Sequence, residues 1–282
     1  MKRVKGMGWE RDLPDFRDLT HQSPNIQGIR SKSKRLQRAA KKVPSSIDLR
    51  EWCSPIEDQE DLGSCTANAG VGLLEYFQRR AYGKHLDGSR LFLYKTTRDL
   101  LGWAGDQGAY LRATMKAMVL FGVPPEDYWP YDLPKFDVEP PAFCYAFAQS
   151  YQALKYYRLD PPGQSTSKAL HALKESLAAG LPAMFGFTVY SSIPPIGDGK
   201  GEIPFPKPGD AVEGGHAVVA VGYDDKRKIG KDGGAILIRN SWGTDWGGEG
   251  YGWLPYSYVE AGLAVDIWSL IEAEFTDTDL FE

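Results

Sequence analysis

The chain has few cysteines and lacks any long hydrophobic run. Three cysteines, Cys53, Cys65 and Cys144, occur among 282 residues, so at most one disulfide can form and one thiol is left over. No stretch reaches the roughly 18 apolar residues that a membrane-spanning helix needs. The basic N-terminus is not followed by an apolar segment, which argues against an ordinary signal peptide. We therefore expect no membrane partner, and a cytoplasmic location or export by a route without a recognisable signal.

Patterns that bind metals or nucleotides are also missing. The sequence contains no C-x-x-C or H-x-x-x-H spacing and no glycine loop of the Walker or Rossmann type. We therefore expect no metal and no cofactor. The composition, 42% hydrophobic and 25% charged, is that of an ordinary globular protein with one large domain or two lobes.

Charge is unevenly distributed along the chain. Residues 1–43 carry 12 Lys or Arg and 4 Asp or Glu, a net +8, whereas residues 44–282 carry 21 and 33, a net −12. Such a basic arm indicates a nucleic-acid tail, a segment that docks on its own body, or a solvated disordered arm. Because the body is acidic, we favour docking and expect no nucleic-acid partner. Residues 30–42 are compatible with a short helix or a linker.

The order of apolar residues divides the body into a helical half and a strand-rich half. Helices are expected over 64–82, with Ser64 as the cap, over 110–121 and over 167–179. Strands are expected over 183–189, 216–223, 235–240, 250–254 and 264–271. The sequence predicts an α+β fold with two lobes, and a cleft between them is a usual place for a substrate.

A candidate nucleophile, Cys65, lies at the start of the first expected helix. Free amide groups and the helix dipole favour a thiolate there. An isolated cysteine is more often a small buried residue, but the segment Gln59-Glu60-Asp61-Leu62-Gly63-Ser64-Cys65 favours catalysis. The Gln59 amide and the Cys65 amide are suited to donate to a developing oxyanion, where the loss of one donor costs roughly 3–4 kcal/mol.

A candidate general base, His216, follows a Gly-Gly pair at the start of an apolar strand. Asn240 is expected to accept the imidazole N–H and fix its tautomer. Trp242 is expected to cover that hydrogen bond, or else to be plain core. The remaining histidines, His21, His85 and His171, have no comparable motif and are interpreted as arm, surface or packing residues.

These fragments together resemble the papain-like cysteine peptidase family. The matching stretches cover about residues 43–270, and Leu62-Gly63-Ser64-Cys65-Thr66-Ala67-Asn68 is similar to a bacterial-type branch. The matching stretches are Val43-Pro44 with Ile47-Asp48-Leu49-Arg50, Gln59 with Gly63-Ser64-Cys65, Gly108-Ala109-Tyr110, Tyr128-Trp129-Pro130-Tyr131, Gly215-His216-Ala217-Val218 and Ile236 to Gly247. The resemblance implies a helical L lobe over about 44–160 and an antiparallel β-barrel-like R lobe over about 161–282, with the active site in the cleft between them.

The resemblance also implies the chemistry. It gives Cys65, His216, Asn240 and Gln59 the four catalytic roles of a thiol endopeptidase that forms an acyl-enzyme intermediate with a peptide or protein substrate. It implies substrate-binding roles for Gly108, Ala109, Tyr110, Gly186, Gly215, Ala217, Trp242 and Asp266. Asp266 would lie at the floor of the main specificity pocket and admit Arg or Lys as well as apolar side chains. Two departures from the family pattern are Leu62 in place of a cysteine, which fits a reducing compartment, and Thr66 in place of a tryptophan.

The arm, residues 1–43, is shorter than the prodomains of many family members. Residues 20–43 alone, extended, would span up to about 80 Å, so we expect the arm to lie across the cleft and inhibit the enzyme, with its basic stretch open to cleavage. The acidic residues around Gln59 either rim the cleft and attract basic substrates or form a solvated turn. Two other functions stay open. One is a catalytically silent binding protein, and the other is an amidase, deconjugase or transferase that uses the same thiol.

Overall fold

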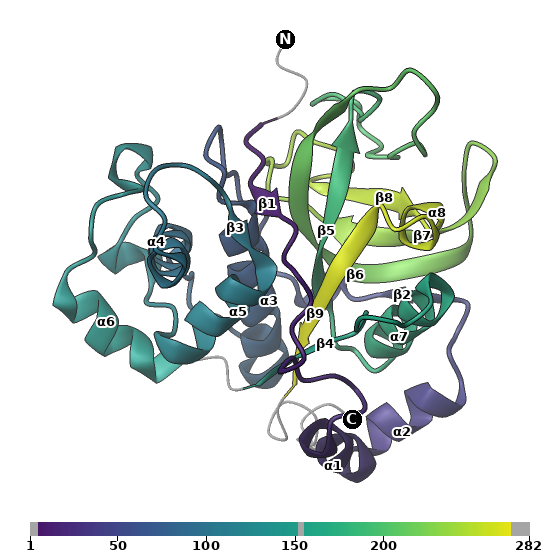
Figure 1. Cartoon of the computed structure of the whole chain (residues 1–282), viewed down its shortest axis with the longest axis horizontal. Coiled ribbons are helices and arrows are strands. Elements are labelled where there is room, and N and C mark those ends of the chain that lie inside the picture. The colour runs from purple at the N-terminus through teal and green to yellow at the C-terminus, as the bar shows by residue number, and fades with distance from the viewer. Residues whose placement is uncertain (1–4, 152–154, 272–282) are drawn as a thin grey trace.

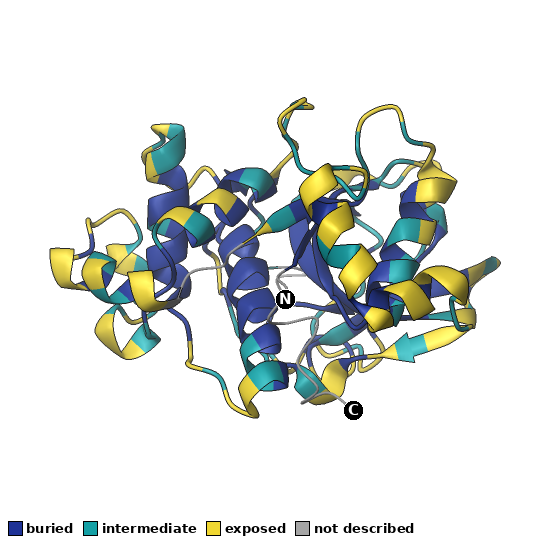
Figure 2. Cartoon of the chain, turned by 90° about the horizontal axis from the view of Figure 1, so that it is seen from below, coloured by how far each residue is buried: buried dark blue, intermediate teal, exposed yellow. Residues whose placement is uncertain are grey.

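The structure, a computed structural model, describes residues 5–151 and 155–271. The helices between residues 65 and 148 gather on one side, and an antiparallel sheet with the remaining helices lies on the other, with the helix α3 (Cys65–Tyr82) packed against the sheet (Figure 1). The buried side chains form a core that continues from α3 into the sheet, while the outer helices show exposed faces (Figure 2). The α+β two-lobe fold expected from the sequence is therefore confirmed.

The helical part is built around α3, which is buried over most of its length. α3 ends at Gly83, whose φ of 70° forms the left-handed C-cap that glycine favours. Ser64 does not cap the helix as expected, because its side chain makes no capping hydrogen bond. α4 (Arg90–Leu101) and α5 (Leu111–Leu120) pack against α3, and α6 (Ala142–Ala148) packs on Phe92 of α4. The 3-10 turns are Arg50–Trp52, Glu126–Tyr128, Leu133–Lys135 and Gln149–Tyr151.

Seven strands form one antiparallel sheet within the described residues. The order is β4-β9-β5-β6-β7-β8, and β2 also pairs with β6. In the central register Phe187 faces His216 and Gly186 faces Ala217. The strands are β2 (Ser46–Asp48), β4 (Tyr156–Arg158), β5 (Ala183–Tyr190), β6 (Val212–Ile229), β7 (Asp232–Arg239), β8 (Tyr251–Pro255) and β9 (Ala264–Leu270).

Some expected elements needed correction. The strand expected over 216–223 runs over Val212–Ile229, because register shifts let it continue past its buried centre. α4 was not expected, because Lys95, Thr96 and Thr97 interrupt the apolar pattern in its middle. The helix begins after Ser89, whose hydroxyl accepts a hydrogen bond from the Phe92 amide, and it ends at Gly102. The short helix α8 (Ser257–Glu260) precedes β9.

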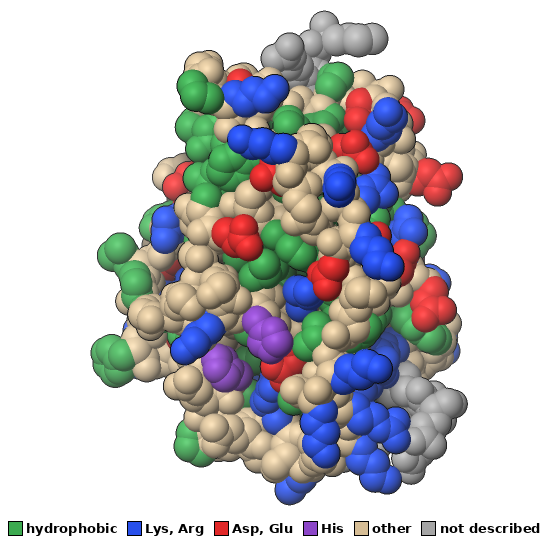
Figure 3. All heavy atoms as spheres, turned by 90° about the vertical axis from the view of Figure 1, so that its right-hand side faces the viewer, with side chains coloured by type: hydrophobic (Ala, Val, Ile, Leu, Met, Phe, Trp, Pro, Cys, Tyr) green, Lys and Arg blue, Asp and Glu red, His purple; other side chains and the backbone are tan. Residues whose placement is uncertain are grey.

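The first 43 residues have two structurally different parts. Trp9 and Glu10 form the short strand β1, which pairs in parallel with β3 (Ala109–Tyr110) between the helices and the sheet (Figure 1). The basic stretch forms α1 (Pro24–Lys32) and α2 (Lys34–Lys41), and α2 packs against α7 (Thr166–Ala178). Lys and Arg side chains gather on the lower part of the face over these helices (Figure 3).

The arm reaches the cleft, and its basic stretch, compatible from the sequence with a short helix or a linker, is helical. The basic helices lie beside α7 with Ile26, Leu36 and Ala39 buried, and the cleft is crossed by residues 6–10 instead. Apolar burial and an ion pair between Arg30 and Glu175 hold α1 and α2 to the body. No described helix has the length and apolarity needed to cross a bilayer.

Candidate active site

Cys65 is the first residue of α3 and is fully buried. Its Sγ accepts a hydrogen bond of 3.3 Å from the amide of Ala217, the residue after His216 in β6. The Ser64 hydroxyl is engaged elsewhere, 2.6 Å from Tyr131 Oη and 3.0 Å from the Asn68 side-chain nitrogen. The sulfur therefore lies at the junction of the central helix and the sheet.

His216 lies in β6 with its Nε2 2.7 Å from Oδ1 of Asn240. The same Asn240 oxygen accepts a 2.8 Å hydrogen bond from the Ser241 amide, which fixes the orientation of the Asn240 side chain. Trp242 stacks on the imidazole with ring centroids 4.4 Å apart, so it shields the hydrogen bond as expected. His216 Nδ1 has no hydrogen-bond partner among the described residues and is left available for a proton.

Gln59 is fully buried and is held at both ends of its amide. Its Oε1 accepts a 2.6 Å hydrogen bond from the Ser241 hydroxyl, so Nε2 must point the other way. Nε2 donates to the carbonyl oxygens of Leu62, at 2.9 Å, and of Gly6, at 2.8 Å. A donor with a fixed direction is what an oxyanion site requires. Sequence reasoning gave Ser241 no role, although it lies in the motif that contains Asn240.

Residues 6–9 of the arm occupy this site. The Gly6 carbonyl, besides its bond from Gln59, lies 3.3 Å from Nε1 of Trp242, and the Gly6 amide donates to the Glu60 carbonyl at 2.8 Å. The Gly8 carbonyl accepts a 2.7 Å hydrogen bond from the Ala109 amide, while the Gly8 amide faces the Cys65 sulfur. The arm therefore covers the sulfur and its neighbours directly.

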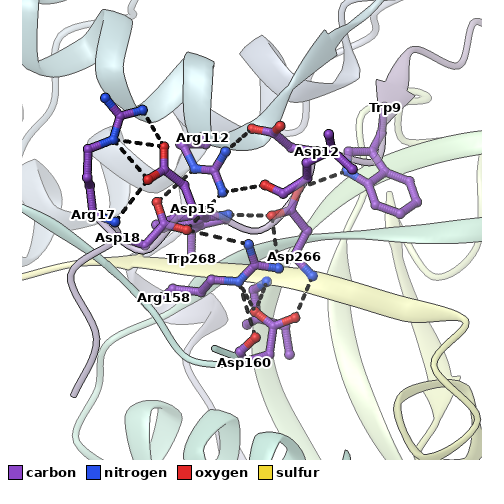
Figure 4. A network of polar contacts seen from close by, with 12 residues as sticks. Trp9, Asp12, Asp15, Arg17, Asp18, Arg112, Arg158, Asp160, Asp266 and Trp268 are labelled. Atoms are coloured by element: carbon purple, nitrogen blue, oxygen red, sulfur yellow. Dashed lines mark hydrogen bonds and ion pairs between the residues drawn. The ribbon is translucent and has the colours of Figure 1, made fainter. Parts of the chain in front are cut away.

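Trp9 lies beside Asp266, the residue expected at the floor of the specificity pocket (Figure 4). Its indole ring lies against Gly186 so closely that a Cβ there would come within 2.0 Å of the ring, and its carbonyl lies against Gly215. At the far end its Nε1 donates to Oδ2 of Asp266 at 3.3 Å. Trp9 is only 7% exposed and was not recognised from the sequence as a pocket residue.

All the residues expected to bind substrate therefore lie along the path of the arm. Ala217 contacts the Cys65 sulfur, and each of the others approaches or pairs with Gly6, Gly8, Trp9 or Glu10. These others are Gly108, Ala109, Tyr110, Gly186, Gly215, Trp242 and Asp266.

Burial controls ionisation in the site. It raises the pKa of the Cys65 thiol to about 12, against the opposing effect of the amides of Ala217, Gly8 and Thr66. It lowers the pKa of His216 to about 4, although the Asn240 hydrogen bond acts in the other direction. Thiol and imidazole are therefore both neutral in the covered site.

Asp266 combines burial with ionic contacts. Burial raises its pKa to about 6, while Arg158, whose guanidinium lies 3.5 Å away, and the indole of Trp268 lower it. Its backbone has a φ of 62°, uncommon for an aspartate. Burial and the ionic contacts therefore act on the pKa of the Asp266 carboxyl in opposite directions.

The acidic residues around Gln59 are partly committed to ion pairs. Glu57 lies 2.9 Å from the Arg90 guanidinium, and Asp58 pairs with Lys5 of the arm. Asp58 thus lies beside the arm at the rim of the cleft, whereas Glu57 forms an ion pair with α4. No cluster of three or more His, Cys, Asp or Glu suited to a metal ion occurs in the part of the chain that the structure describes.

Comparison with known proteins agrees with this geometry. The model of the papain family of cysteine proteases matches residues 43–267. An uncharacterised peptidase C1-like protein of Acanthamoeba polyphaga mimivirus is 36% identical over 280 residues, covering 95% of this chain and 87% of that protein. Xylellain, a cysteine protease from Xylella fastidiosa, superimposes with a TM-score of 0.76 at 33% identity, covering 96% and 98% of the two chains. A digestive procathepsin L 3 from Tenebrio molitor, at 17% identity, a TM-score of 0.62 and coverage of 95% and 76%, shares the fold.

Proposed function

The chain belongs to the papain family of cysteine proteases, and from that premise we propose that it is an endopeptidase that acts through Cys65 and is held inactive by its own N-terminal segment. The observation that carries the first part is the convergence of Cys65, His216, Asn240 and Gln59 at the junction of α3 and β6. The second part is supported by the position of residues 6–9 on those same atoms.

In the proposed reaction the Cys65 thiol gives its proton to Nδ1 of His216, and the thiolate attacks the carbonyl carbon of the scissile peptide. Nε2–H of His216 meanwhile donates to Asn240, which holds the ring in place. The negative charge that develops on the carbonyl oxygen is stabilised by Nε2 of Gln59 and the backbone amide of Cys65.

The intermediate then collapses to an acyl-enzyme. The C–N bond breaks, and the leaving amine takes the proton from Nδ1 of His216. A water molecule next gives a proton to the same nitrogen and attacks the thioester. The C–S bond breaks, the acid product leaves and the proton returns to the sulfur.

The closed site lacks the charges that this reaction needs. With the thiol's pKa raised to about 12 and that of the imidazole lowered to about 4, proton transfer between them is unfavourable. Removal of the arm admits water, which solvates both charges and allows the thiolate–imidazolium pair to form. The arm thus restrains activity through electrostatics as well as by occupying space.

The direction of the arm supports restraint without self-cleavage. β1 runs parallel to β3, and the arm passes from the oxyanion site at Gly6 to the pocket at Trp9. In a substrate the penultimate residue precedes the scissile carbonyl, so the chain passes the pocket first and the oxyanion site second. The arm passes the two places in the reverse order, so a substrate runs in the opposite direction. The arm's peptide groups are therefore reversed relative to the geometry of attack.

Asp266 is proposed to accept a basic penultimate residue. Its two oxygens face Trp9 and Trp268, and a donor on the substrate would replace the Trp9 indole. The neighbouring Arg158 offsets part of the negative charge, so aromatic and apolar residues are accepted as well.

Hydrolysis of a fluorogenic dipeptide with Phe then Arg before the scissile bond tests this function. The comparison uses the full-length protein, Cys65→Ala and Trp9→Ala. Deletion of residues 1–43 is avoided because it would also remove the contacts of α1 and α2 with the body. Activity lost in Cys65→Ala and raised in Trp9→Ala is expected. Folded proteins that never cleave a peptide would instead support a binding role or a non-peptidic amide substrate.

A further inference from the structure

Beyond Trp9 the arm reaches a cationic side chain of the body, Arg112 in α5 (Figure 4). The Arg112 guanidinium forms an ion pair with Asp12, and donates to both oxygens of Asp18 at 2.8 Å and to the Leu13 carbonyl at 2.8 Å. Each of these acceptors belongs to the arm. Arg112 has no ion pair or hydrogen bond with a body acid among the residues that the structure describes.

The neighbouring Arg158 differs in this respect. Besides its 3.7 Å approach to Asp18, it lies 3.0 Å from Asp160 and 3.5 Å from Asp266, both body residues. When the arm leaves, Arg158 keeps its partners and Arg112 loses its own. The departure therefore leaves one unpaired guanidinium next to the specificity pocket.

The body holds Arg112 in position independently of the arm. Its guanidinium lies 5.7 Å from the ring centroid of Trp268, which also faces Asp266. Beside it is a cavity of about 320 Å³, whose lining on the body side includes Lys116, one helical turn along α5, and Lys155. Such a group of cations with a fixed guanidinium is suited to bind a carboxylate.

A substrate passes over this group on its way into the pocket. The arm residue Glu10 pairs with Tyr110, two residues before Arg112, and Asp12 lies three residues beyond Trp9. At about 3.3 Å per residue, three residues of extended chain span about 10 Å. Because the penultimate residue of a substrate occupies the Trp9 pocket, the residues that precede it lie along β3 toward Arg112.

We propose that Arg112, supported by Lys116 and Lys155, forms a substrate subsite for an Asp or Glu side chain about three residues before the penultimate residue. In the closed form Asp12 and Asp18 of the arm occupy this subsite in place of the substrate's carboxylate. The enzyme therefore selects peptides that are acidic on the N-terminal side of the cleavage site. This inference rests on the proposed peptidase function.

The test is a selectivity ratio measured with two internally quenched peptides. Both carry Phe-Arg before the scissile bond, and they differ by Asp or Asn at the third position before the Phe, with the second and fourth positions scanned in the same way. Full-length Trp9→Ala is compared with the same protein carrying Arg112→Gln or Arg112→Lys. Because both peptides compete with the same arm, the ratio of their kcat/KM values is independent of how far the arm has opened.

We expect a three- to tenfold preference for Asp in one register, lost in Arg112→Gln, retained in part in Arg112→Lys and reduced by salt. Cys65-dependent hydrolysis with a ratio near one at every position overturns the subsite and leaves the peptidase intact. Absence of Cys65-dependent hydrolysis overturns both. Full-length Asp12→Asn/Asp18→Asn, which loosens the arm by another route, provides the same ratio if Trp9→Ala does not fold.

Discussion

The carbonyl oxygen of Gly6 accepts a 2.8 Å hydrogen bond from Nε2 of Gln59, the donor that we assign to the oxyanion. The arm thus occupies the position where a substrate carbonyl would be activated. Trp9, three residues later, fills the pocket that would receive the penultimate residue. Under the proposed function one short segment blocks two separate substrate positions, so the release of either contact should be measurable as activity.

Replacement of Trp9 by Ala should activate the full-length protein. Trp9 is 7% exposed, and loss of a buried Trp side chain typically costs about 3–5 kcal/mol. Most of this loss should destabilise the closed form, because the Trp9 side chain is buried there. We expect the initial rate on a Phe-Arg substrate to rise at least about tenfold. Phe16→Ala, in the same arm but 97% exposed, is the matched control and should leave the rate unchanged.

Replacement of Gln59 by Ala should lower kcat by about 10²–10³, with a small effect on KM, since the donor acts on the transition state. Ser241→Ala removes only the hydrogen bond that orients Gln59. Its net value of about 1 kcal/mol corresponds to a roughly fivefold decrease. Both measurements belong in the Trp9→Ala background. A kcat unaffected by Gln59→Ala would remove Gln59 from the oxyanion site.

The four candidate catalytic residues could be identified from the sequence because each lies in a short motif whose chemistry depends on residue type. The arm was predicted to lie across the cleft, but the part of it that does so was not. The opposite net charge of the whole arm suggested docking, whereas the contacts in the cleft depend on Gly6, Gly8 and Trp9, which carry no charge.

Beyond Trp9, the charged residues in contact have signs opposite to the net charges of the segments that carry them. There the acids Asp12 and Asp18 belong to the basic arm and Arg112 to the acidic body. Pairing of this kind depends on where α5 lies relative to β1, and no local pattern in the sequence encodes that distance. Ser241 and Tyr131 were missed for a similar reason, since their roles are hydrogen bonds to distant residues.

The reactivity of Cys65 should depend on pH in a way that reports opening. Burial raises the thiol's pKa to about 12, so the thiolate fraction at pH 8 in the closed form is about 10⁻⁴ and grows as pH rises toward 12. Alkylation by iodoacetamide should therefore be slow near neutrality in the full-length protein. In Trp9→Ala, where water and His216 stabilise the thiolate, it should be faster at pH 6–8 and less steep with pH. Identical pH profiles would contradict the proposed electrostatic restraint.

Asp266→Asn should reduce cleavage after a basic penultimate residue relative to an aromatic one. The amide keeps the shape of the carboxylate at a position with a φ of 62° but removes its charge. The Arg-to-Phe ratio of kcat/KM, measured in the Trp9→Ala background with and without Asp266→Asn, measures this effect, and an unchanged ratio would remove Asp266 from the choice of substrate.

Gly8→Ala should activate the enzyme without replacing Trp9 or any charged residue of the arm. A Cβ at position 8 would lie 1.8 Å from the Gly63 carbonyl oxygen, a backbone atom beside the nucleophile that cannot turn aside, so the arm must lift at this point. Gly28→Ala in α1 is the matched control, because a Cβ there meets nothing within 4 Å and alanine favours the helix. We expect faster hydrolysis and faster alkylation of Cys65 in Gly8→Ala, and parental rates in Gly28→Ala. Activation by both substitutions would mean that the arm is loosened by any change within it, and parental rates in both would mean that contact at Gly8 does not restrain the thiol.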